Sequence, residues 1–551
     1  MPSLHRLQPG TSYPLHSAVA TRQIELLAAA QLPSHTLMQR AGLAVARLAC
    51  ALAPHAQTIW VACGPGNNGG DGFEAAMHLQ RWGHRPVVTF YGDEARLPAD
   101  ALASLARARA AGVVLATEPP AQCDLAIDAL LGIGGETAKP VDIHPLTEQI
   151  STLQNTASAR PLPPLMATWL QHMHANAAAV LCVDLPSGLQ ANTGIYADTA
   201  FATQFTASPA TFHWAKRLYC LNLLTVKPGV FTAQGKDAAG QVWWDDLGVS
   251  KAALPTAALP ADGLPMDARA TVDLATARLL GADRAALPAR AHASHKGSFG
   301  DVAVVGGAPG MLGAALLAAR AALHTGAGRV FVGLLDGGSM AVDPQQPELM
   351  FRPVDHLNLR ASTVVCGCGG GNAVRAVLPR VLSQSPRLVL DADALNAIAQ
   401  DSALHTLLIA RAQRGYATIL TPHPLEAARL LACTTAQIQA NRLQAAQQLA
   451  DTFQCTVVLK GAGSIIATPN EPPCINSSGN AKLATGGTGD VLAGIAGAHL
   501  AGGHCAFQAA CTAVYQHGKV ADDWPVQSPL TAGQMAQFIK TTSLHLEEAG
   551  I

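Results

Sequence analysis

The chain has 551 residues, and its 36 Lys and Arg residues nearly balance its 37 Asp and Glu residues, giving a formal net charge of −1. This balance excludes the strong basic field by which many proteins attract nucleic acids or anionic lipids, so we expect neither as a partner. The length exceeds one ordinary domain, and a composition of 49% hydrophobic and 13% charged residues with 50 glycines excludes a disordered chain and favours an α/β protein.

The sequence also bears on compartment. The Ala-rich stretch at 314–328 is interrupted by Arg320 and His324 and is too short to span a membrane. The first residues, MPSLHRLQPGTSYPLHS, lack the pattern of a secretory signal. The 12 cysteines form no CxxC pair, so we interpret them as small core residues. We therefore expect a cytoplasmic protein with no membrane partner.

Short apolar runs typical of strands recur along the chain, each followed by a turn and a helix-like stretch. Such alternation predicts parallel sheets covered by helices on both faces, with ligands at the carboxyl ends of the strands. The runs occupy residues 58–63, 85–91, 123–130, 178–185, 300–307, 329–335, 362–367, 387–393, 417–423 and 455–461.

The runs fall into two groups, which predicts two three-layer αβα domains. Between the groups lies an Ala- and Pro-rich stretch in which we expect no strand before residue 300. We place the junction near residues 250–270, with domains at 1–255 and 256–551. Residues 151–177 are predicted to be an inserted loop followed by a helix.

The first domain carries GPGNNGGDG after its first predicted strand. Gly64, Gly66 and Gly69 fit the dinucleotide pattern GxGxxG, with Asp93 as a possible ribose ligand, but a tight structural turn explains such a match equally well. The added polar residues of this turn, Asn67, Asn68 and Asp71, favour a binding site.

Two further strand ends bring Asp128, Asp184 and Ser187 to the same predicted rim. Hard oxygen ligands without thiolates or paired histidines suit an alkali or alkaline-earth cation better than zinc. The alternative is that Asp128 and Asp184 only cap nearby backbone amides.

These motifs, together with LMQRAG (37–42) and KPGVFTAQGKDAAGQVWWDDLGV (227–249), resemble the NAD(P)H-hydrate epimerase family over about residues 15–250. The resemblance implies a Rossmann-like domain in which Asn68, Asp128 and Ser187 surround K⁺ and Asp184 contacts the substrate as an acid or base catalyst. The residues implied to bind the hydrated nicotinamide nucleotide are Asn67, Asn68, Gly69, Gly70, Asp71, Gly132, Ile133, Gly134, Gly135, Glu136, Thr137, Ala138 and Asp184. The 151–177 insertion and the segment 206–220 depart from the family pattern.

The second group of strand ends carries CGCGGG (366–371), DADALN (391–396), TPHPLEAARL (421–430) and KGAGS (460–464). His423, between two prolines at a strand-to-helix junction, favours a ligand role over a core role. Asp393 could bind a ligand or cap the following helix.

The stretch LATGGTGDVLAG (483–494) has a glycine turn but no Walker lysine. Its amides and the following helix N-terminus could hold an anion, which leaves Asp490 free for proton transfer. This arrangement resembles the ribokinase-like fold.

The full motif set of this half resembles the ADP-dependent NAD(P)H-hydrate dehydratase family over about residues 270–545. The resemblance implies catalysis by Asp490. Ala314, a glycine at Gly369 or Gly371, His423 and Asp490 would contact the hydrated nicotinamide. The implied ligands of the adenine nucleotide are Lys460, Gly461, Ala462, Gly463, Ser464 and Gly489. Cys368 stands where the family commonly has proline.

Together the two resemblances imply a repair enzyme for hydrated NADH and NADPH. One domain would epimerise the R and S hydrates, and the other would dehydrate the S hydrate with ADP and Mg²⁺, giving AMP and phosphate. The predicted partners are these small molecules, and we expect a homo-oligomer. The alternative is a ribokinase-like small-molecule kinase whose N-terminal half is a nucleotide-binding interaction module.

Overall fold

The computed structural model describes residues 4–8, 10–133, 162–196, 217–249, 275–282 and 292–539. Its contacts divide the chain into two compact units, the first running to Thr276 and the second beginning at Ala277 and including residues 10–13. Among the described helices, none combines the length and hydropathy that a membrane crossing requires. The predicted boundary at 255/256 lies outside the described residues.

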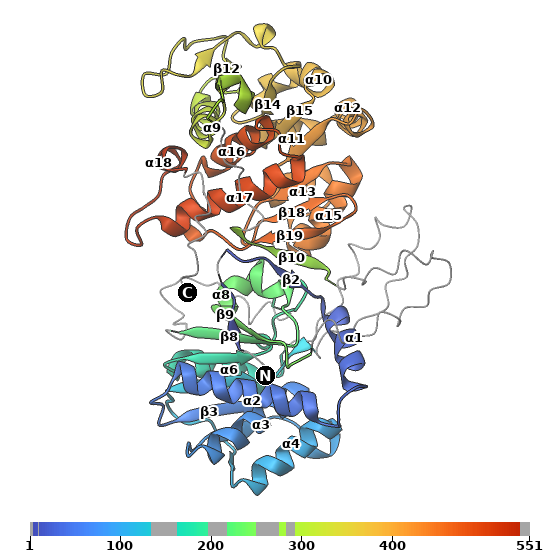
Figure 1. Ribbon diagram of the computed structural model, residues 1–551, viewed down its shortest axis with the longest axis vertical. Helices are drawn as coiled ribbons and strands as arrows, with labels where there is room; N and C mark the ends of the chain where they lie inside the picture. The colour runs from blue at the N-terminus through green and yellow to red at the C-terminus, as the bar shows by residue number, and fades with distance from the viewer. Residues whose placement is uncertain are drawn as a thin grey trace, which may run out of the picture. The chain divides into compact units, whose positions relative to one another are not determined.

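The first unit contains a mainly parallel sheet between two helical layers (Figure 1). Alternate residues of β3 face opposite layers, because successive side chains of a strand point to opposite faces. Ile59 and Val61 pack with α2, α3 and α4, whereas Trp60 and Ala62 pack with α6 and α8. In spatial order the strands are β1 (His5–Arg6), β9 (Gln241–Asp245), β8 (Leu218–Leu223), β7 (Val180–Val183), β6 (Leu125–Ala129), β3 (Ile59–Cys63), β4 (Val87–Phe90) and β5 (Val114–Ala116).

The helices of this unit include the helix predicted within the 151–177 insertion, observed as α6. The predicted loop ahead of it lies largely outside the described residues. The helices are α1 (Ala18–Ala29), α2 (Thr36–Leu52), α3 (Asn67–Arg81), α4 (Ala99–Ala110), α6 (Pro164–Asn176) and α8 (Gly235–Ala239), with 3-10 turns η1 (Glu94–Arg96) and η3 (Pro228–Phe231).

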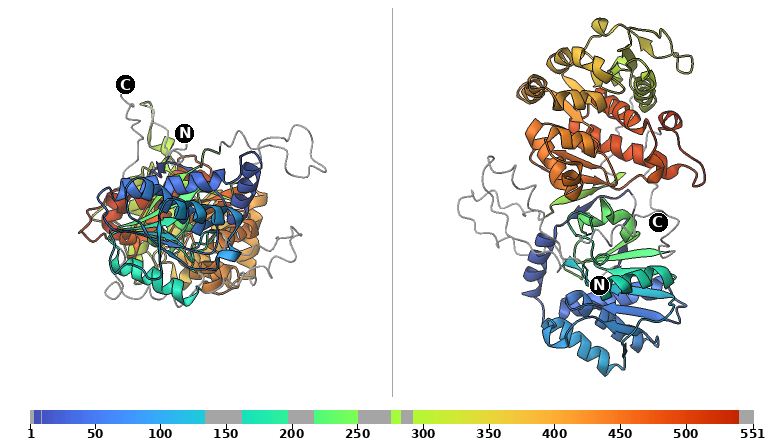
Figure 2. Two further views of the ribbon diagram at one scale, coloured as in Figure 1. Left: turned by 90° about the horizontal axis from the view of Figure 1, so that it is seen from below. Right: turned by 180° about the vertical axis from the view of Figure 1, so that it is seen from behind.

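The second unit is also an αβα sandwich, and Figure 2 shows its layers from behind. Val302 and Val304 of β11 belong to the core cluster formed with α9, α16, α17 and α18, and α15 packs on β17 and β18. In spatial order the strands are β13 (Met350–Phe351), β12 (Arg329–Leu334), β11 (Asp301–Gly306), β14 (Thr363–Cys366), β15 (Arg387–Leu390), β16 (Ala417–Leu420), β17 (Thr456–Leu459), β18 (Ile465–Thr468), β19 (Glu471–Asn476), β10 (Ala277–Leu280) and β2 (Tyr13–Leu15).

The Ala-rich helices α9 and α16 pack on strands of this sheet. The helices of the unit are α9 (Leu312–Thr325), α10 (Val374–Gln384), α11 (Ala392–Ala399), α12 (Ser402–Gln413), α13 (Pro424–Leu430), α14 (Thr435–Ala440), α15 (Arg442–Phe453), α16 (Thr488–Ala501), α17 (Ala506–Asp523) and α18 (Ala532–Gln537). The 3-10 turns are η7 (Lys296–Phe299), η8 (Val354–His356), η9 (Gly371–Ala373) and η10 (Ala481–Leu483).

All ten predicted strands are present, and β11, β12, β14, β15, β16 and β17 pair in parallel as expected. The expectation of no strand before residue 300 was wrong. β10 lies in that stretch and pairs in parallel with β19. Its four residues, ARLL, are too few to show a period, so only pairing with β19 reveals the strand. All 12 cysteines are free, and nine are buried as the core interpretation expects, but Cys505 is exposed and Cys50 and Cys433 are partly exposed.

Candidate active sites

In both sheets the chain adds strands first on one side of a central strand and then on the other, which creates a topological switch point at the strand ends. In the first unit the chain leaves β3 toward β4 and β5, then returns to build outward from β6. In the second unit the corresponding break lies between β11 and β14. Ligands of open α/β sheets bind at such switch points.

The first switch point contains a cavity of about 740 Å³. Side chains of α1, α2 and the first turn of α3 line it, together with the loops after β6, β7 and β8. Of the predicted substrate residues, Asn67, Asn68, Asp71, Ile133 and Asp184 line this cavity, and so does Gly132. Gly134, Gly135, Glu136, Thr137 and Ala138 lie outside the described residues. The former dinucleotide candidate Asp93 instead caps η1, where it accepts the Ala95 N–H at 3.0 Å.

Close backbone approach explains why this turn is built from glycine. A Cβ on Gly64 would lie 1.8 Å from the Leu130 carbonyl oxygen, and one on Gly69 would lie 2.0 Å from the Gly64 carbonyl oxygen. A Cβ on Gly70 would meet Ala101 of α4 at 2.8 Å. Without side chains at these positions, α3 can begin directly at Asn67 and present Asn68 and Asp71 to the cavity.

Asp184 follows β7 in a left-handed conformation with φ of 65°. Its Oδ1 accepts hydrogen bonds from Lys227 Nζ and, at 3.2 Å, from the Leu223 N–H. Lys227 Nζ also donates to the Leu223 carbonyl at 2.6 Å, and its side chain is only 1% exposed. The ammonium is therefore fixed beside the Asp184 carboxylate inside the protein.

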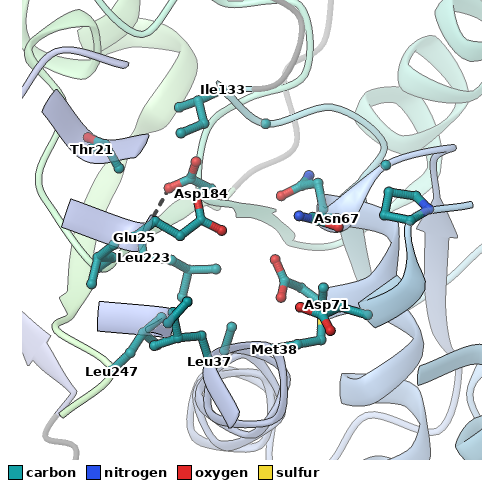
Figure 3. Close-up of a pocket in the computed structure, with 18 of the residues that line it drawn as sticks. Thr21, Glu25, Leu37, Met38, Asn67, Asp71, Ile133, Asp184, Leu223 and Leu247 are labelled. Atoms are coloured by element: carbon teal, nitrogen blue, oxygen red, sulfur yellow. Dashed lines mark hydrogen bonds between the residues drawn. The ribbon is translucent and has the colours of Figure 1, made fainter. Parts of the chain in front are cut away.

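Glu25 and Asp71 share this cavity with Asp184, and Asp100 also lines it. Figure 3 shows Asp71 on one wall, with Glu25 and Asp184 on the other. Burial, reinforced by the charge of Asp184, raises the pKa of Asp71 well above its usual value and also raises the pKa of Glu25. The cavity therefore combines one lysine-paired carboxylate with two carboxyl groups that tend to retain a proton.

The predicted cation ligands lie at the three neighbouring strand ends, as expected. Asp128 Oδ1 accepts from Ser187 Oγ at 2.6 Å, and its Oδ2 accepts from the Ser187 N–H at 2.9 Å. Burial raises the pKa of Asp128, while these hydrogen bonds oppose the rise. Asp128 and Asp184 thus each accept a hydrogen bond from a backbone amide, from Ser187 and Leu223 respectively, as the alternative interpretation expected.

Asn68 is buried beside Gly132, and a Cβ on that glycine would lie 3.1 Å from Asn68 Oδ1 and 3.4 Å from Asp184 Oδ2. The Nδ2 of Asn68 has no hydrogen-bond partner within the described part of the chain. Asn68 is thus a buried polar group facing a ligand-sized space.

At the second switch point, the loop after β14 packs against the first turn of α9. Gly369 and Gly371 have φ values of 58° and 51°, a region that glycine enters without strain. A Cβ on Gly369 would lie 2.9 Å from that of Ala314, so these two predicted substrate contacts are neighbours.

Lys460, at the end of β17, points to the start of α16. Its Nζ donates to Asp391 Oδ1 at 2.6 Å and lies 4.0 Å from Glu426 Oε2. Burial alone would lower the pKa of Lys460, but the Asp391 and Glu426 carboxylates hold it above the usual value. A Cβ on Gly489 would lie 3.4 Å from Lys460 Nζ, so these two predicted nucleotide ligands lie together.

The remaining predicted nucleotide residues form a turn after β17. Gly461 and Gly463 have φ values of 144° and 61°, and Ser464 Oγ donates to the Gly461 carbonyl at 3.2 Å. Gly461 and Ala462 are exposed. The turn therefore presents backbone to solvent beside Lys460.

Asp490 lies in the first turn of α16, where burial and then the charge of Asp391 raise its pKa to about 6. The Cys368 Sγ and carboxylate oxygens of Asp391 and Asp490 all lie within 4.8 Å of one another. A carboxyl group that titrates near neutral pH is suited to proton transfer.

His423 caps α13 and is half exposed. Its Nδ1 accepts from the backbone N–H groups of Leu425 and Glu426 at 3.1 and 3.2 Å, and its Nε2 lies 3.2 Å from Glu426 Oε1. Burial raises the pKa of Glu426 to about 7. Of the two alternatives left open for Asp393, the helix cap does not apply, because α11 begins after Asp391 and Asp393 accepts the Gly371 N–H at 2.8 Å.

Sequence reasoning missed several ionisable groups at these sites, among them Glu25, Lys227, Asp391 and Glu426. Lys227 opens the segment KPGVF, Asp391 opens DADALN and Glu426 lies in TPHPLEAARL, so these three were inside stretches already singled out. Glu25 had no such signal, because it lies on an ordinary amphipathic helix.

Comparison with known proteins gives two family matches. Residues 34–218 match the model for the YjeF-related protein N-terminus, and residues 302–542 match the model described as NAD(P)H-hydrate dehydratase.

Three relatives illustrate the similarity, two over most of the chain and one over 45% of it. The bifunctional NAD(P)H-hydrate repair enzyme Nnr of Moorella thermoacetica is 31% identical over 97% of each chain. The enzyme of that name from Escherichia coli K12 is 32% identical over 89% of this chain and 85% of its own. The ADP-dependent (S)-NAD(P)H-hydrate dehydratase of Neisseria meningitidis serogroup B is 45% identical over 45% of this chain and 85% of its own.

Proposed function

The chain belongs to the family of bifunctional NAD(P)H-hydrate repair enzymes, and we propose that the sites at its two switch points divide the repair as set out below. It is an NAD(P)H-hydrate epimerase in its N-terminal half and an ADP-dependent NAD(P)H-hydrate dehydratase in its C-terminal half. One observation carries the proposed division: each site holds a lysine paired with a buried carboxylate, Lys227 with Asp184 and Lys460 with Asp391 near Asp490. We keep 255/256 as the proposed domain boundary.

In the proposed epimerase step, the carbinolamine C–O bond of the hydrate breaks and re-forms from the opposite face. The departing hydroxyl group takes a proton, and the returning water gives one up. Glu25 or Asp71, with raised pKa values, suits the donor role, and Asp184 beside Lys227 suits the acceptor role. The hydrated nucleotide would lie against Asn67–Asp71 and the Gly132–Ala138 loop.

We also propose that K⁺ is held by Asn68, Asp128 and Ser187. The donors are hard oxygens, and the buried Asp128 carboxylate has no ion-pair partner among the described residues, so a cation would compensate its charge. Bound there, the ion would supply positive charge next to the substrate pocket. The surrounding chain would still perform the proton transfers.

In the proposed dehydratase step, Asp490 accepts the proton of the substrate hydroxyl group as its oxygen attacks the β-phosphorus of ADP. AMP leaves. The C–O bond to the ring carbon then breaks and phosphate departs, because the ring nitrogen donates its lone pair toward that carbon. Loss of the adjacent C–H proton restores NADH or NADPH. Lys460 and the amides around Gly489 suit the stabilisation of phosphate charge.

The adenine nucleotide would contact Lys460, Gly489 and the Gly461–Ser464 turn, and Mg²⁺ would accompany its phosphates. Ala314, Gly369 or Gly371, and His423 would face the nicotinamide. The kinase alternative loses support, because relatives that match about nine-tenths of this chain or more are named as repair enzymes. The homo-oligomer remains a prediction.

The test is recovery of nicotinamide absorbance from separated R and S hydrates of NADH, with ADP or ATP. We expect the S hydrate to be recovered with ADP by the dehydratase unit alone, and the R hydrate to require both units. Asp184→Asn should slow recovery only from R, whereas Asp490→Asn should stop recovery from both while R-to-S exchange continues. Failure of the intact protein to recover S with either nucleotide would overturn the assignment.

A further inference from the structure

The thiol of Cys368 is the polar group on the β14 side of Asp490 that the proposed mechanism does not use. Cys368 is fully buried, and its Sγ lies within 4.8 Å of carboxylate oxygens of both Asp490 and Asp391. Burial strongly raises the pKa of this thiol, and the two carboxylates raise it further. The sulfur therefore keeps its proton and can act as a hydrogen-bond donor.

The backbone fixes the position of this sulfur. The Cys368 carbonyl accepts the Gly307 N–H at 3.0 Å, and the Gly367 N–H donates to the Val305 carbonyl at 3.0 Å. A Cβ on Gly306 would lie 2.3 Å from the Cys368 carbonyl oxygen, and one on Gly367 would lie 2.0 Å from that of Asp391. The loop is thus held between β11 and α11, which leaves the sulfur little freedom.

Resting on the proposed function, we propose that Cys368 is a positioning residue of the dehydratase, donating its S–H to the Asp490 carboxylate and thereby orienting the oxygen that exchanges the substrate proton. A donor at this point favours the ionised carboxylate and restricts its rotation. Cys368 itself contacts no reacting atom in this scheme.

The other charged groups around Asp490 each raise or lower its pKa. Asp391 and Asp393 of α11 oppose ionisation, Lys460 after β17 favours it, and the thiol also lowers the pKa of Asp490. On α17, His517 Nε2 lies 2.8 Å from the Thr488 carbonyl, and burial lowers the pKa of this histidine to about 4, so it adds no charge near neutral pH. Removing the thiol should therefore raise the pKa of Asp490.

The experiment compares Cys368→Ala and Cys368→Ser with Cys366→Ala in the full-length protein. Cys366 is a matched control, because it is equally buried two residues away, in β14, and has no carboxylate among the causes of its pKa rise. The readouts are the pH profile of ADP-dependent recovery from the S hydrate and the 13C titration of the Asp490 carboxyl group, assigned by its loss in Asp490→Asn.

We expect the Cys368→Ala midpoint to rise by about half a pH unit or more, roughly a threefold change in the ionisation equilibrium. The midpoint rises whether Asp490 acts as acid or base, since the same group titrates. Cys368→Ser should titrate at or below the wild-type midpoint, because a hydroxyl is a stronger donor than a thiol. Cys366→Ala should match the wild type.

An unchanged midpoint in Cys368→Ala, or a Cys368→Ser midpoint above the wild type, would overturn this positioning role. Should Cys368→Ala fail to fold, the Cys368→Ser comparison still decides the matter. Should the wild type show no dehydration at all, the proposed function fails separately, and the 13C titration still tests the contact between thiol and carboxylate.

Discussion

Replacing Lys227 with Met removes the buried ammonium beside Asp184 while keeping a side chain of similar length. The Asp184 side chain is 10% exposed and shares its cavity with Glu25 and Asp71, so the variant leaves a buried carboxylate next to two other acids. Breaking one partner out of a buried pair costs about 3–5 kcal/mol. We expect a loss of this size in the first unit, with the Asp184 carboxyl group tending to bind a proton. R-to-S exchange should fall sharply, since the proposed acceptor would be neutral.

Because a two-unit chain does not unfold in one step, the stability change is best read from hydrogen exchange of the amides in β7 and β8. The control is the double variant Lys227→Met/Asp184→Asn. It should recover most of the protection from hydrogen exchange, but it should not recover R-to-S epimerisation. Dehydration of the S hydrate should be unchanged throughout. If Lys227→Met were as protected and as active as the wild type, the buried ion pair would have no part in either stability or catalysis.

Three further predictions concern other parts of the structure. The pKa of Asp490 in the folded protein, about 6, lies above its usual 3.8, so folding favours the protonated carboxyl group. The stability gained from this protonation is lost as the pH rises through 6. Asp490→Asn should therefore stabilise the second unit at pH 8 by at most about 3 kcal/mol and have little effect at pH 4, as measured by denaturant titration; equal effects at both pH values would contradict this. Gly69→Ala should severely destabilise the first unit, because its Cβ would lie 2.0 Å from the Gly64 carbonyl oxygen, whereas Gly66→Ala, with open space around it, should fold normally; thermal unfolding compares the two. Replacing K⁺ in the buffer with a large organic cation should slow R-to-S epimerisation and leave dehydration of the S hydrate with ADP unchanged. Equal epimerisation rates in both buffers would refute the proposed K⁺ site.

The sequence alone determined the features that depend on local pattern. Apolar runs ending in glycine turns gave the ten strands and their helices, because burial on a parallel sheet requires a continuous apolar run and the next turn requires residues without side chains. The same logic placed Asn68, Asp128 and Asp184 at neighbouring strand ends, since parallel strands present their carboxyl ends to one edge.

Only the tertiary structure decided which charges meet there. Lys227 reaches Asp184 across 43 positions of sequence, Lys460 reaches Asp391 across 69, and Glu25 enters the cavity from a helix whose sequence has no distinguishing feature. It also decided that β10 is a strand and that the Cys368 Sγ lies within 4.8 Å of an Asp490 carboxylate oxygen. Local propensity predicts the backbone conformation of each segment. A pKa or an ion pair depends instead on which distant side chains share a low-dielectric space, and the packing of the whole unit decides that.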